Sequence, residues 1–186
     1  MTVTKRIFTI AILTILPLMQ MMAQSIEGKW KMSPEALEAM EIGDDNATGD
    51  IILQFGQTDV TLFFQVNYSD DEVGTIGFEM SMPGTYKMVD NNVIENTFNE
   101  EAADAQINKL ELSSEIKKAM DASAEVKSMF INALTSELNK NKPQMIEGLK
   151  MIGKSLAKTN IVKNDGTTLT LSFDDKTIDM IKVVEE

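Results

Sequence analysis

The spacing of apolar residues changes twice along this chain, and these changes constrain the fold more than any other feature. In residues 50–98, and again after residue 158, short runs alternate apolar and polar side chains, which is typical of half-buried β-strands. Between Ser113 and Lys158 the apolar residues instead recur every three or four positions, which predicts amphipathic helices. The sequence therefore predicts a mainly β protein with a helical insertion at residues 113–158.

The strand-like runs are separated by short turn sequences such as Pro83-Gly84, which favour hairpins over parallel crossovers. We expect strands at residues 26–32, 51–55, 60–68, 76–82, 86–89, 93–98, 105–112, 161–162, 169–173 and 178–184. The predicted fold is an antiparallel meander, closed as a barrel or stacked as a sandwich, of about eight to ten strands. A helical hairpin is inserted before the last strands.

Two sequence signals set the expected helix limits. Ser33-Pro34-Glu35 combines a capping hydroxyl, a proline in the first helical position and an acid in the first turn, which predicts a short helix after the first strand. Asn141-Lys142-Pro143 interrupts the long helical run and is expected to separate the two helices of the hairpin. The insertion is rich in methionine, which suits adaptable binding surfaces and equally suits packing against the barrel.

The first 24 residues have the order of a secretory signal. Lys5 and Arg6 precede an apolar run from Ile7 to Met19 that is too short to span a bilayer comfortably. Cleavage after Ala23 and cleavage after Gln24 are both compatible with the sequence, and an uncleaved anchor is a further alternative. We expect an exported protein with a mature domain at residues 25–186 that has no integral membrane span.

The charged and reactive residues argue against several functions. With 29 acidic and 17 basic residues, the chain would be repelled by nucleic acid. It contains no histidine or cysteine, and Ser155 near Lys154 and Lys158 has the spacing of an ordinary solvated helix face. Acidic pairs such as Asp174-Asp175 lack the spacing of a calcium loop and suit solvated turns. We expect no enzyme activity, no cofactor and no metal site.

Three segments carry a resemblance to a known family. They are Gly28-Lys29-Trp30, Gly84-Thr85-Tyr86 followed by Asn91-Asn92-Val93-Ile94, and Leu169-Thr170-Leu171-Ser172-Phe173. In this order they resemble the lipocalin-like, calycin-type proteins that Gram-negative bacteria export, in which the first segment corresponds to a G-x-W motif. The resemblance covers both ends of the mature chain and omits residues 113–158. It implies that Trp30 closes one barrel end beneath a basic side chain, for which Lys182 is best placed.

The resemblance also implies a capacity to bind an apolar ligand. Alternation places apolar side chains of two neighbouring strands on one face, and with the tryptophan they form our candidate ligand-binding set: Trp30, Phe64, Val66, Phe78 and Met80. We expect a binding module of the bacterial cell envelope that holds an apolar small molecule in the barrel mouth, partly covered by the insertion. The alternative is a filled barrel that contacts another envelope protein through the insertion or an edge strand.

Overall fold

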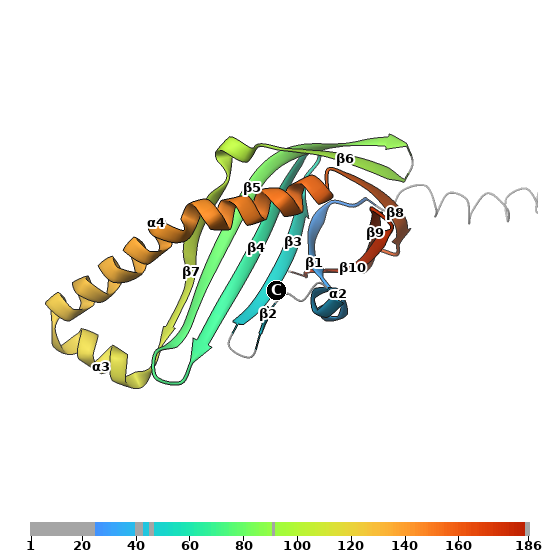
Figure 1. Cartoon of the computed structure of the whole chain (residues 1–186). Helices are drawn as coiled ribbons and strands as arrows, with labels where there is room; N and C mark the ends of the chain where they lie inside the picture. Colours follow the sequence, from blue (N-terminus) through green and yellow to red (C-terminus); the bar gives the residue numbers. More distant parts are fainter. Residues whose placement is uncertain (1–24, 40–42, 45–46, 91, 185–186) are drawn as a thin grey trace, which may run out of the picture.

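The computed structural model describes residues 25–39, 43–44, 47–90 and 92–184 (Figure 1). The expected signal segment, residues 1–24, lies outside the described residues. The strands are β1 (Gly28–Met32), β2 (Gly43–Asp44), β3 (Ala47–Phe55), β4 (Asp59–Asp70), β5 (Gly74–Asp90), β6 (Val93–Phe98), β7 (Asp104–Leu112), β8 (Lys158–Asn164), β9 (Thr168–Phe173) and β10 (Lys176–Lys182). The helices are α2 (Pro34–Ala39), the 3-10 turn η1 (Glu100–Ala102), α3 (Ser114–Ala122) and α4 (Ala124–Ser155).

The strands form a closed antiparallel barrel. Its order is β1-β10-β9-β8-β6-β5-β4-β3, and β1 closes the ring by pairing with both β10 and β3. The short strand β2 adds to β3, and β7 pairs with β5 outside the ring. The predicted mainly β meander barrel with a helical insertion before the last strands is therefore confirmed. The short helix α2 also begins as expected, since the Ser33 hydroxyl accepts a hydrogen bond from the Ala36 N–H at 3.2 Å.

The predicted turn at Pro83-Gly84 is wrong, because β5 continues through it as one strand of 17 residues. One edge of β5 pairs with β7 up to Ser81 and with β6 from Gly84 onward. The Pro83 carbonyl accepts a hydrogen bond from the Asn99 N–H on this edge, so the proline nitrogen faces the gap between the two partner strands. A residue without a backbone N–H is tolerated in such a gap.

The predicted break at Asn141-Lys142-Pro143 is also wrong. Helix α4 continues through Pro143, and the two helices of the insertion separate at Ser123, whose hydroxyl accepts a hydrogen bond from the Val126 N–H at the start of α4. An internal proline costs a helix about 3 kcal/mol. Buried side chains on both sides of it, Leu138 and Leu149, stabilise the continuous helix by tertiary packing.

Figure 1 shows α4 lying across one face of the sheet formed by β3, β4, β5 and β7, with α3 at the end far from the barrel. Within the described residues, no helix combines the length and apolar character needed to cross a bilayer. Lys142 of α4 forms an ion pair with Asp104 at the start of β7, and Lys150 and Lys154 approach Glu100 of η1. These ion pairs tie the helix to the edge of the sheet.

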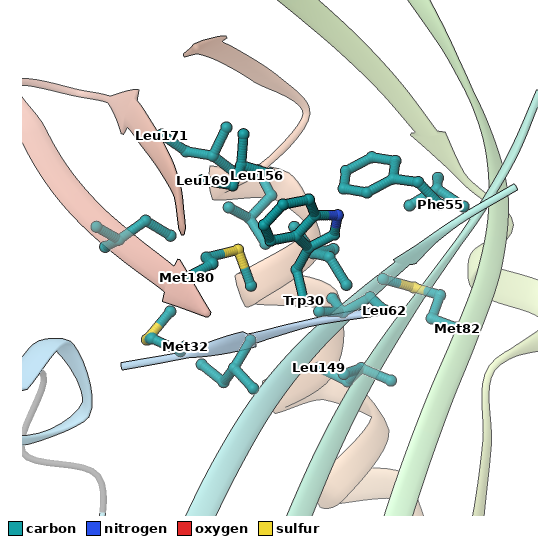
Figure 2. Close-up of a cluster of buried hydrophobic side chains, with 14 of the residues drawn as sticks. Trp30, Met32, Phe55, Leu62, Met82, Leu149, Leu156, Leu169, Leu171 and Met180 are labelled. Carbon is teal, nitrogen blue, oxygen red and sulfur yellow. The ribbon is translucent and has the colours of Figure 1, made fainter. Parts of the chain in front are cut away.

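The core lies inside the barrel and includes the C-terminal end of α4. Figure 2 shows the buried side chains that surround the tryptophan: Trp30, Met32, Phe55, Leu62, Met82, Leu149, Leu156, Leu169, Leu171 and Met180. Helix and strand approach closely here, since a Cβ on Gly153 would lie 2.4 Å from the Met82 Cε. Leu149 and Leu156 are buried in this core, so the last turns of the insertion belong to the same folding unit as the barrel.

A candidate apolar binding cleft

The floor of the cleft continues the core-facing surface of β4 and β5. On β4, Val60 and Leu62 are buried in the core, and the next residues on the same face, Phe64 and Val66, are only partly buried. The strand register pairs Phe64 with Met80 and Val66 with Phe78. Met80 is buried in the core, and Phe64, Val66 and Phe78 continue the apolar surface beyond the part of the sheet that the core covers.

The roof is one face of α4. Leu138, Met145 and Ile152 are spaced seven residues apart, so they point to the same side of the helix, toward the sheet. Between roof and floor lies a cleft of about 550 Å³ that opens to solvent. The lining residues are Phe64, Val66, Tyr68, Phe78, Met80, Glu137, Leu138, Asn141, Gln144, Met145, Gly148 and Ile152.

Four of the five candidate ligand-binding residues come together in this cleft, namely Phe64, Val66, Phe78 and Met80. Trp30 does not line it and lies fully buried in the core. Sequence reasoning did not assign the α4 lining residues to a ligand site. The helical spacing of Leu138, Met145 and Ile152 indicates an apolar helix face, but it does not reveal which surface of the sheet that face covers.

Trp30 instead sits at the barrel closure with the other two motif residues. Its indole Nε1–H donates a hydrogen bond to the Ile26 carbonyl at 2.6 Å. The β1–β10 register places Lys182 opposite Trp30, and the lysine Nζ lies 5.2 Å from the centroid of the indole ring. Gly28 has φ 122°, and a Cβ there would lie 3.0 Å from the Lys182 Cε. The glycine thus leaves room for the lysine to reach the tryptophan.

The helical rim of the cleft is polar. Glu137 carries the only charge among the described residues that line the cleft. Its carboxylate accepts a hydrogen bond from the Asn141 Nδ2 at 2.8 Å, and the Lys140 Nζ lies 3.5 Å from its Oε1. The hydrogen bond and then the lysine charge hold the pKa of Glu137 below its usual value, so this carboxylate is ionised at neutral pH.

The acidic side chains of the described ranges nowhere gather in a group of three or more that could hold a metal ion. No protein-family model, curated protein or solved structure matches this chain at a significant level.

Proposed function

We propose that this protein is an exported, non-catalytic binding module of the bacterial cell envelope that holds an apolar small molecule between α4 and the β4–β5 surface. The observation that carries the proposal is the cleft, whose volume of about 550 Å³ falls within the usual range of small-molecule sites. Its floor is apolar except for the Tyr68 hydroxyl, and its other polar side chains, Glu137, Asn141 and Gln144, lie along the helical rim. This division suits a ligand with an apolar body and a small polar end.

Two further observations support this proposal. Phe64 and Phe78 remain partly exposed in the cleft, and an apolar ligand that covers them gains about 25 cal/mol for each Å² removed from water. The charge and apolar pattern of residues 1–24 favours export, and the lipocalin-like order of segments favours a ligand-binding role. Export is tested by N-terminal sequencing of the mature protein, which should begin at Gln24 or Ser25. An intact Met1 on a soluble cytoplasmic protein would contradict it.

A second candidate function is that of an interaction module for another envelope protein. Helix α3 and the first turns of α4 project beyond the sheet (Figure 1), and Val126, Met129 and Ile131 are exposed there. Exposed apolar side chains on a projecting helix are typical of helix-mediated contacts. In this case the cleft would have no small-molecule occupant.

The two functions are distinguished by uptake of the uncharged, environment-sensitive dye N-phenyl-1-naphthylamine. Gly148 lines the cleft and a Cβ there would meet no atom within 4 Å, so Gly148→Phe starts its side chain in open volume and should occupy part of the cleft. We expect the unmodified protein to bind the dye and Gly148→Phe to weaken binding by about tenfold or more. The matched control is Met151→Phe, which adds the same side chain at a position of α4 that is 70% exposed.

The control variant should bind the dye as the unmodified protein does, and mass spectrometry of the native protein should detect a co-purifying apolar compound. If the unmodified protein neither binds dye nor carries such a compound, the small-molecule function is wrong and the interaction function replaces it. Equal binding by Gly148→Phe and the unmodified protein would move the dye site away from this cleft.

A further inference from the structure

We infer that the cleft selects its ligand by the charge of the polar end: it accepts amphiphiles with a cationic or uncharged hydrogen-bond-donating head and disfavours those with a carboxylate head. This inference deepens the proposed function and rests on it. The residues that carry it are Glu137, Asn141 and Gln144 on the rim and the apolar floor opposite them.

Apart from Tyr68 on β4, the polar lining residues lie on one side of the cleft. Glu137, Asn141 and Gln144 occupy positions i, i+4 and i+7 of α4 and therefore form a single strip along the helix. The sheet side of the cleft presents Phe64 and Val66 instead. A bound amphiphile would therefore place its chain on the floor and its head against the helical strip.

The strip is rich in hydrogen-bond acceptors. The Asn141 Nδ2 donates both to the Glu137 carbonyl at 3.0 Å and to the Glu137 Oε1 at 2.8 Å, so both of its hydrogens are engaged. The Asn141 Oδ1 and the Glu137 carboxylate are acceptors, and the Gln144 amide can both accept and donate. A hydroxyl or ammonium head finds acceptors here, whereas a carboxylate head would lie beside the negative charge of Glu137.

The lysines near the strip do not line the cleft, and two of them pair with carboxylates outside it. Lys142 forms an ion pair with Asp104, and Lys150 lies 2.8 Å from Glu147. Lys140 approaches Glu137, but its side chain is 74% exposed, and a solvated pair of this kind is weak enough for a ligand ammonium to replace it. The net charge of −12 adds a general repulsion of anions.

The experiment compares three probes with the same twelve-carbon chain that differ only in the head: dodecylammonium, dodecanol and laurate. Each displaces N-phenyl-1-naphthylamine from the protein at low salt, below its micelle concentration. One carboxylate about 4 Å from a charged head in a solvated rim changes affinity about fivefold. We therefore expect the ammonium probe to displace the dye at about fivefold lower concentration than dodecanol, and laurate to be the weakest.

Two perturbations assign the preference to Glu137. Glu137→Gln keeps the shape of the side chain, and it should remove the advantage of the ammonium probe without changing dodecanol binding. Glu147→Gln is the matched control, because Glu147 is an exposed carboxylate of the same helix that does not line the cleft. It should leave the order of the probes unchanged, and added salt should reduce the ammonium advantage in the unmodified protein.

If laurate binds as tightly as the ammonium probe, or if Glu137→Gln keeps the full preference, selection by head charge is wrong while the cleft remains a binding site. If the unmodified protein neither binds the dye nor carries a co-purifying apolar compound, the proposed function and this inference are both overturned.

Discussion

Leu149 tests whether the C-terminal end of α4 is part of the barrel core. Its side chain is completely buried within the cluster around Trp30 (Figure 2). Leu149→Ala removes this packing without loss of helix propensity, since both residues are good helix formers. Buried leucine-to-alanine changes cost about 2.7–5 kcal/mol, depending on how far the surroundings relax into the cavity. The hydrogen-bonded barrel wall restricts relaxation, so we expect the free energy of unfolding to fall by about 3–4 kcal/mol.

The assay is urea unfolding followed by circular dichroism and by Trp30 fluorescence, which should report one coincident transition. For a domain of this size, the expected loss corresponds to a fall in Tm of about 6–16 °C. The control is Met151→Ala, two residues away on the exposed side of α4, which should change stability by less than about 0.5 kcal/mol. A loss below about 1 kcal/mol in Leu149→Ala would refute the assignment of this helix end to the core.

Three further changes test individual contacts. Pro143→Ala restores a backbone N–H donor inside α4 and should raise the free energy of unfolding by about 1–3 kcal/mol in urea. No gain would mean that Pro143 does not destabilise the helix. Lys182→Met removes the cation above Trp30, and we expect a loss of about 0.5–1 kcal/mol and altered Trp30 emission, whereas unchanged emission would contradict the contact. Lys163 and the backbone N–H groups of Thr168 and Thr167 hold the pKa of Asp165 below its usual value. Asp165→Asn should therefore be less stable than the unmodified protein at pH 7, with a difference that shrinks as pH falls below about 4; a difference independent of pH would contradict this.

Much of the cleft floor could be predicted because a strand has a simple geometry. Side chains on β4 and β5 alternate between two faces, so Phe64, Val66, Phe78 and Met80 share a surface wherever the strands pair in register. The partial burial of Phe64, Val66 and Phe78, and the full burial of Met80, could not be predicted. Both depend on where α4 crosses the sheet, and no local pattern in the sequence specifies that position.

The two wrong predictions have one physical cause. Pro83-Gly84 and Pro143 are strong local signals for a turn and for a helix end, yet each lies inside a continuous element that long-range contacts stabilise. The role suggested for Glu137 was missed for a related reason. A charged residue on an amphipathic helix has the sequence pattern of a solvated face, and only the packing of α4 places it at the mouth of a cleft.

Strands β6 and β7 pair along the same edge of β5, and this division sets how much of the sheet closes into the barrel and how much extends beyond it. The 17 residues of β5 are divided between β6, which closes the circle, and β7, which widens the sheet. Each β5 residue that paired with β6 instead of β7 would lengthen the closed part of the barrel by about 3.4 Å along the strand. It would shorten the open sheet beneath α4 by the same amount. Phe78 and Met80 both lie in the part that β7 holds. The size of the cleft in this architecture therefore depends on the lengths of two neighbouring strands, with every lining side chain left as it is.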